Sequence, residues 1–174
     1  MLSIKNSSLL NIENIDVLCN AANGAGPMGS GIAGALRIAG GKELQDSAIE
    51  VCKANSFINE DGKSEFGFKE GTSYWSKPGT LKTKAILHIV TMRNPGGVTT
   101  LDICRAALKH GIIAIFKREY KSLGITALGT GVGGLDKNEV AKMMMEEFLP
   151  YRNLLDIHIR DIDPDFCRFC ESYL

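Results

Sequence analysis

Residues 19–34 read CNAANGAGPMGSGIAG, a stretch in which five glycines follow a short apolar run. The preceding segment, NIDVLCNAA at 14–22, has the pattern of a strand that stops at small residues, and residues 31–55 have helical spacing. A glycine-rich turn that opens a helix presents backbone N–H groups to an anion, with no Cβ to obstruct its approach. The stretch therefore predicts a phosphate-binding loop between a strand and a helix.

The composition is that of an ordinary globular protein. The chain has 174 residues, of which 44% are apolar and 23% charged, enough for a core without disulfides or metal. Its 20 basic and 20 acidic residues cancel, so the net charge indicates neither membrane attraction nor general nucleic-acid binding. Residues 1–16 lack the pattern of a signal peptide, and no apolar run is long enough to span a bilayer. Five scattered cysteines are typical of free thiols in a reducing compartment, so we expect a cytoplasmic protein.

The rest of the chain alternates between strand and helix patterns. Strands are expected at 14–22, 72–77, 84–92, 125–129 and 154–161, and helices at 31–55, 99–124, 136–149 and 163–174. Gly40 and Gly41 are expected to break the first helix in two, and the polar segment 58–71 to form a surface loop or irregular hairpin. This alternation predicts one α/β domain over residues 1–174, with a mostly parallel sheet covered on both faces.

A second glycine-rich loop, LGTGVGGL at 128–135, also follows an expected strand and precedes an expected helix. In open α/β sheets, ligands bind at the carboxyl ends of the strands, where both loops would lie. Two such loops at one edge of the sheet suit a diphosphate, with one loop on each side of it.

The first loop also contains the pattern G-x-G-x-x-G, as Gly24, Gly26 and Gly29. In a dinucleotide-binding fold, a second strand should end in an acidic residue about 20 residues later. Glu43 and Glu50 instead lie within helix-like sequence, and no strand pattern appears before residue 72. The sequence therefore argues against a dinucleotide fingerprint.

Four segments together resemble the macro domain family, which binds ADP-ribose. They are DVLCNAAN (16–23), GSGIAGAL (29–36), KPGTLKTKAILHIV (77–90) and LGTGVGGLDKNEVAKMM (128–144). They occur in the family's order and spacing and extend over nearly the whole chain. The resemblance implies a three-layer α/β/α fold with a central, mostly parallel mixed sheet, and ADP-ribose or a derivative as ligand. It implies no metal and no cofactor, since such loops bind through backbone dipoles.

The resemblance also assigns binding residues. Asn23 is expected to hydrogen-bond the distal ribose, with capping of its own turn as the alternative, and Asn20 to order the loop. Ile32 and Val132 would close over the diphosphate, and His88 would be a core histidine. The other expected binding residues are Ser8, Leu9, Ala22, Gly29, Ser30, Gly31, Gly129, Thr130, Gly131, Gly133 and Gly134.

The chain departs from the family pattern at three binding positions. Many relatives recognise adenine with an aspartate that falls near Ser8 here, so the charge-assisted hydrogen bond is lost. The aromatic residue that often follows the last strand is replaced by Arg160, which could stack on a base or pair with Asp161 or Asp163. Gly133 stands where many relatives have a tyrosine, and this is expected to open the site.

Catalysis is less clearly indicated than binding. One branch of the family has an aspartate where this chain has Ala33, and another uses a lysine and an aspartate that match Lys77 and, less well, Asp136. The alternative for Lys77 is an ordinary surface lysine, and the alternative for Asp136 is a helix cap. The pair Cys167 and Cys170 has metal-ligand spacing but lacks a second pair, so no zinc is expected.

Three functions remain after these departures, and two of them involve ADP-ribose. The chain is either a hydrolase, with Asn23 orienting the distal ribose, or a non-catalytic reader of ADP-ribosylated partners. The hydrolase would remove ADP-ribose from a modified macromolecule, or phosphate from ADP-ribose 1''-phosphate. An NAD-dependent enzyme is a third possibility, which predicts tighter binding of NAD than of ADP-ribose. A lone domain of this size is expected to be a monomer.

Overall fold

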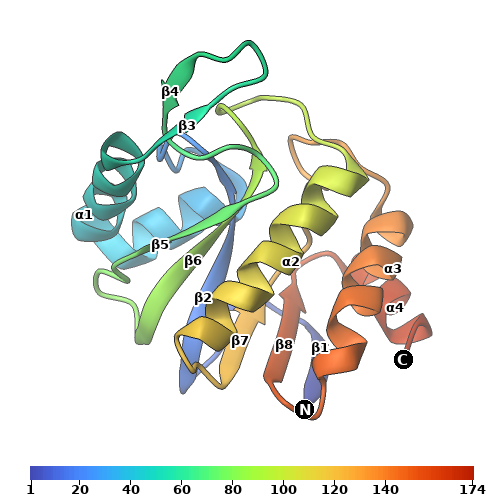
Figure 1. Cartoon of the computed structure of the whole chain (residues 1–174). Helices are drawn as coiled ribbons and strands as arrows, with labels where there is room; N and C mark the ends of the chain where they lie inside the picture. The colour runs from blue at the N-terminus through green and yellow to red at the C-terminus, as the bar shows by residue number, and fades with distance from the viewer.

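The computed structural model describes residues 1–174 and has one central sheet of six strands (Figure 1). The strands lie in the order β1–β8–β7–β2–β6–β5, and only β5 is antiparallel to its neighbour. Their bounds are β1 Leu2–Asn6, β2 Ile15–Asn23, β5 Ser73–Ser76, β6 Thr83–Met92, β7 Ser122–Ile125 and β8 Asp156–Asp161. The predicted mostly parallel mixed sheet is confirmed.

Helices cover both faces of this sheet (Figure 1). They are α1 Gly31–Ala54, α2 Leu101–Lys117, α3 Lys137–Phe148 and α4 Pro164–Ser172, with 3-10 turns at η1 Leu9–Asn11 and η2 Leu149–Tyr151. Alternate residues of β2 pack against the two helical layers, because successive side chains of a strand point to opposite faces. Val17 and Cys19 pack with α2, α3 and α4, whereas Leu18 packs with α1. The three-layer α/β/α fold is therefore confirmed.

The predicted break in the first helix is confirmed at Gly41. Its φ of 77° and ψ of −169° are not helical, so α1 consists of two segments joined by a kink. The turn before β6 packs against this point, since Thr80 N donates to Gly40 O at 3.0 Å. A Cβ on Gly79 would lie 1.9 Å from Gly40 O, so this contact requires glycine at position 79.

The prediction of one helix over 99–124 and a strand over 125–129 was wrong. Helix α2 ends at Lys117, Glu119 reverses the chain with φ 57°, and β7 already occupies Ser122–Ile125. Leu123 and Ile125 are buried in the core from this strand, between β2 and β8. The chain from Thr126 onward then belongs to a loop at the carboxyl edge of the sheet.

Two further strand elements complete the fold. The sequence interpretation missed β1, which pairs with β8 at the edge of the sheet. The segment expected as a loop or irregular hairpin contains a short antiparallel hairpin of β3 Ser56–Ile58 and β4 Ser64–Phe66. All five cysteines are free and buried, and burial raises the pKa of Cys170 to about 12. None of the helices is long and apolar enough to cross a membrane.

Candidate functional site

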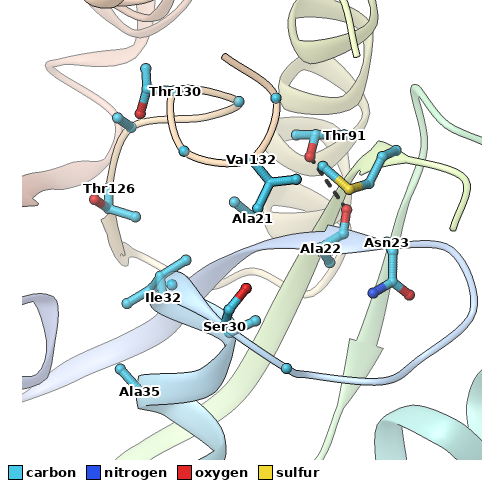
Figure 2. Close-up of a pocket in the computed structure, with 18 of the residues that line it drawn as sticks. Ala21, Ala22, Asn23, Ser30, Ile32, Ala35, Thr91, Thr126, Thr130 and Val132 are labelled. Atoms are coloured by element: carbon cyan, nitrogen blue, oxygen red, sulfur yellow. Dashed lines mark hydrogen bonds between the residues drawn. The ribbon is translucent and has the colours of Figure 1, made fainter. Parts of the chain in front are cut away.

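A cavity of about 720 Å³ lies at the carboxyl ends of β2, β6, β7 and β8, between the two glycine-rich loops (Figure 2). This volume is in the range of small-molecule sites. The structure brings together in its lining most of the binding residues that the sequence predicts. These are Ser8, Leu9, Ala22, Asn23, Gly29, Ser30, Gly31, Ile32, Gly129, Thr130, Gly131, Val132, Gly133 and Arg160.

Sequence reasoning missed nearly as many lining residues. They are Ala21, Pro27, Ala33, Ala35, Thr91, Met92, Pro95, Gly96, Thr126, Ala127, Asp161 and Ile162. Most of them are the last residues of β6 or β8, or come shortly after β6, β7 or β8, at the edge of the sheet where the two loops were already expected. The rule that ligands lie at this edge could therefore have found them.

The first turn of α1 opens into the cavity without a side-chain cap. The hydroxyl of Ser30, the N-cap residue, accepts no cap hydrogen bond, and the first turn has no acidic residue. The N–H groups of Gly31, Ile32 and Ala33 have no acceptor in the protein. The other three α-helices are capped by Thr100, Asp136 and Asp163. The α1 N-terminus is thus the one that remains available to an anion.

The second loop offers a similar set of donors from the opposite side. Gly129 and Gly134 have φ values of 72° and 66°, and Leu135 N closes the loop by donating to Gly129 O at 3.0 Å. The N–H groups of residues 130–133 between them have no acceptor in the protein and lie in the cavity wall. Gly134 was predicted to bind ligand, but its N–H donates to Gly131 O and the residue lies outside the lining.

Gly133 is required by the fold of its own loop, and the expectation that it opens the site stays a prediction. A Cβ at this position would lie 2.5 Å from Thr99 Cγ2 and 2.6 Å from Gly129 O. A side chain would therefore collide with the loop and with Thr99, which is not a cavity residue. Glycine is present here because the loop is tightly folded.

Asn23 holds the first loop in shape. Its Oδ1 accepts hydrogen bonds from Ala25 N and Gly26 N, each at 3.0 Å, and its Nδ2 donates to Pro27 O at 2.8 Å. An amide oxygen has two lone pairs, so both are used inside the loop. Asn23 therefore caps its turn, as the alternative interpretation had it, and one Nδ2 hydrogen has no acceptor in the protein.

Asn20 lies beneath the cavity and not in its lining. It is 1% exposed, and its Nδ2 is 3.0 Å from Nδ1 of His88, whose Nε2 is 2.7 Å from Ser76 Oγ. Burial lowers the pKa of His88 to about 3, so the imidazole is neutral near pH 7. His88 is the core histidine that was predicted, and Asn20 joins β2 to β6 through it.

The structure does not bring Lys77 or Asp136 to the cavity. Lys77 follows β5, which runs against β6, and Ser76 pairs with Ile86, six residues before Met92. At about 3.3 Å per residue, this places Lys77 about 20 Å from the carboxyl edge of β6. Its Nζ is exposed, 3.8 Å from Glu43 Oε1. Asp136 accepts from Asn138 N and Glu139 N and is a helix cap.

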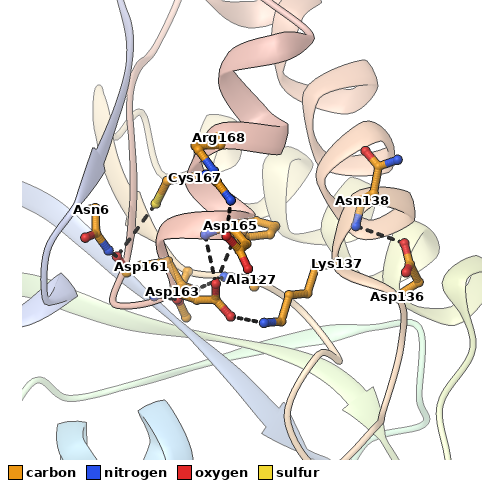
Figure 3. Close-up of polar contacts among 12 residues, drawn as sticks. Asn6, Ala127, Asp136, Lys137, Asn138, Asp161, Asp163, Asp165, Cys167 and Arg168 are labelled. Atoms are coloured by element: carbon orange, nitrogen blue, oxygen red, sulfur yellow. Dashed lines mark hydrogen bonds and ion pairs between the residues drawn. The ribbon is translucent and has the colours of Figure 1, made fainter.

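Arg160 and Asp161 are the two ionisable residues of the lining. The side chains of both make hydrogen bonds to other groups of the protein. Arg160 donates to Ser3 O and Ile159 O from Nη1, and to Ser3 Oγ from Nη2, which also lies 3.1 Å from His158 Nδ1. It has no carboxylate partner, because Asp163 pairs with Lys137 (Figure 3). Of the two interpretations of Arg160, the salt bridge is therefore wrong. Burial lowers the pKa of this guanidinium, which is 7% exposed.

Asp161 connects three segments at the same end of the cavity (Figure 3). Its Oδ2 accepts from Thr126 Oγ1 and from Ala127 N, and its Oδ1 accepts from Asp163 N at 2.8 Å. Its backbone oxygen accepts from Ser7 N at 3.0 Å. The carboxylate thus fixes the wall around Arg160 to the ends of β7 and β8.

The family model for the macro domain matches residues 19–144, which is more than half of the chain. The chain belongs to the macro domain family. An uncharacterized protein of Aquifex aeolicus is 29% identical to it over 161 residues, which are 91% of this chain and 89% of that protein. An uncharacterized protein of Mycobacterium tuberculosis is 30% identical over 75% of this chain but only 32% of its own length.

Two further matches have ADP-ribose or ADPR in their names. The O-acetyl-ADP-ribose deacetylase of Enterobacter cloacae is 27% identical over 81% of this chain and 73% of its own length. A mutant macrodomain of Oceanobacillus iheyensis with ADPR has a TM-score of 0.76 and 18% identity, covering 92% of this chain and 85% of that one. At that identity the structural match establishes the fold alone.

Proposed function

We propose that this chain binds ADP-ribose or a close derivative. The observation that carries the proposal is the pair of donor sets, at the start of α1 and in residues 130–133, on either side of one cavity. Backbone N–H groups in such loops stabilise phosphate oxygens, and two sets fit the two phosphates of a diphosphate. The relatives named for an ADP-ribose ester and solved with ADPR support the choice of nucleotide.

The cavity has two different ends, which favour one orientation of the ligand. Four strands border it from β8 to β6, and their spacing gives a width of about 14 Å, suited to an extended dinucleotide-like molecule. At one end the cavity is lined by Arg160, Asp161 and Ile162, and this is where we place the adenine. At the other end, Asn23 keeps one donor hydrogen for the distal ribose.

Calorimetric titration with ADP-ribose tests this proposal. We expect micromolar binding, about −8 kcal/mol, and at least about tenfold weaker binding by Asn23→Ala. The variant loses the bonds to Ala25 N, Gly26 N and Pro27 O, so the first loop no longer holds its shape. Asn94→Ala is the matched control, because Asn94 is exposed and its side chain makes no hydrogen bond. An absence of binding by the parent protein would contradict the proposal, and tighter binding of NAD would favour the NAD-dependent alternative.

Hydrolysis of a group on the distal ribose is a second candidate function, favoured by the name of the Enterobacter relative. Binding ranks first, because the lining's two ionisable side chains, Arg160 and Asp161, are both held by the protein. The two functions separate when ADP-ribosylated protein, O-acetyl-ADP-ribose or ADP-ribose 1''-phosphate is incubated with the chain. A reader leaves each intact after long incubation, whereas a hydrolase releases ADP-ribose.

We further propose that the chain is a single-domain monomer that acts in the cytoplasm, in keeping with its five free thiols.

A further inference from the structure

The β3–β4 hairpin adjoins the end of the cavity assigned to the distal ribose. Phe68, just after β4, donates its N–H to Gly24 O at 2.9 Å, and Gly24 directly follows Asn23. Arg93, which follows the lining residue Met92, donates from Nε to Glu65 Oε2 at 3.2 Å and from Nη2 to Phe66 O. The hairpin is therefore tied to both segments that wall this end, so anything attached to the distal ribose would emerge beside it.

The two faces of the hairpin differ. In the antiparallel register Phe57 faces Glu65, and this inner side lies on Arg93, whose guanidinium is 5.1 Å from the Phe57 ring centroid. The outer face consists of Ser56, Ile58, Ser64 and Phe66. Ile58 is 64% exposed and Phe66 75% exposed, so two large apolar side chains share one small surface without a partner. Apolar side chains gathered in this way typically mark an interaction site.

The charges of the hairpin region argue against a nucleic-acid partner. Over residues 55–71 the acidic residues are Glu60, Asp61, Glu65 and Glu70, and the basic residues are Lys63 and Lys69. The carboxylate of Glu65 is paired with Arg93, and the remaining acidic groups still outnumber the two lysines. A phosphate backbone is bound through clusters of lysine and arginine. An apolar face with no basic cluster around it suits a polypeptide instead.

We propose that the outer face of the hairpin docks the polypeptide that carries the ADP-ribose, so that the conjugate bound by this chain is a modified protein. The inference rests on the proposed binding of ADP-ribose and names the class of molecule to which the nucleotide is attached. Apolar side chains flanking the modified residue cover Ile58 and Phe66 while the nucleotide occupies the cavity. The binding free energies of the two linked contacts then combine, because the second contact forms within the same complex.

Three probes test the inference by calorimetry. They are free ADP-ribose, ADP-ribose joined through a non-hydrolysable link to a short peptide with leucine and phenylalanine flanks, and the same unit joined to a short DNA strand. We expect the peptide conjugate to bind at least about tenfold more tightly than free ADP-ribose, and the DNA conjugate to gain nothing. The double variant Ile58→Ser, Phe66→Ser should lose the gain with the peptide and keep the parent affinity for free ADP-ribose.

Ile38→Ser is the matched control, because Ile38 is 79% exposed on α1 and lies outside the hairpin. It should keep the full gain. Equal binding of all three probes, a gain with DNA, or a peptide gain that survives in the double variant would each overturn the inference. A parent dimer that the double variant converts to monomers, measured by sedimentation, would also overturn it, since a second copy would then cover the face. Failure of free ADP-ribose to bind would instead remove the proposed function on which the inference rests.

Discussion

Replacing Ser30 by aspartate is expected to weaken ADP-ribose binding strongly and, at the same time, to stabilise the fold. Ser30 is the N-cap of α1, has the extended backbone that caps adopt, and makes no cap hydrogen bond. An aspartate there can accept from the N–H groups of Ile32 and Ala33. These are donors that the proposed diphosphate requires, so the new carboxylate both occupies them and repels the phosphates.

The two effects have opposite signs and are measured separately. Loss of two charge-assisted hydrogen bonds costs about 3 kcal/mol, so the affinity for ADP-ribose should fall at least about a hundredfold by calorimetry. A new cap should add about 1 kcal/mol to the free energy of unfolding and raise Tm by about 2–4 °C. Ser30→Ala is the control and should change neither quantity much, since the Ser30 hydroxyl makes no cap bond. If Ser30→Asp binds as the parent does, the diphosphate does not lie at α1.

The sheet and both loops could be predicted because their signals are local. Short apolar runs such as that of β2 end at small residues, and glycines follow where the chain turns into a loop. The boundary between α2 and β7 lacks such a signal. The reversal there uses Glu119 at φ 57°, a conformation more typical of glycine or asparagine, and the short apolar run of β7 fits either a helix or a strand.

In the candidate site, too, the residues with a local sequence signal could be predicted and the others could not. Binding residues near the glycine loops could be predicted, because backbone donors are fixed by loop position and not by side-chain chemistry. Lys77 was misplaced because nothing in TSYWSK reveals that β5 runs antiparallel, which sends its end away from the cavity. The uncapped N-terminus of α1 could not be predicted from the sequence either, because serine is among the commonest N-cap residues. Only the structure shows that the Ser30 side chain makes no cap hydrogen bond.

The role of Asp161 is another property that depends on tertiary contacts. Asp161→Asn is expected to destabilise the protein and weaken adenosine binding together. The carboxylate accepts bonds from Thr126 Oγ1, Ala127 N and Asp163 N, and the residue is 9% exposed. An amide has one oxygen, so its NH₂ group must face at least one of these donors. Either Ala127 N, which is buried, or Asp163 N, which is partly buried, then loses its acceptor.

Leaving such a donor unsatisfied costs about 2–3 kcal/mol, which should lower Tm by about 5–10 °C in thermal unfolding. Thr126 and Ala127 also line the cavity beside Arg160, so the affinity for AMP should fall about tenfold by calorimetry. Asp165→Asn is the matched control, because Asp165 pairs with Arg168 at the exposed surface and should change stability by less than about 0.5 kcal/mol. If Asp161→Asn unfolds at the parent's temperature, the three hydrogen bonds do not hold this wall. If instead stability falls and AMP affinity is unchanged, Asp161 supports the fold and the adenosine lies elsewhere.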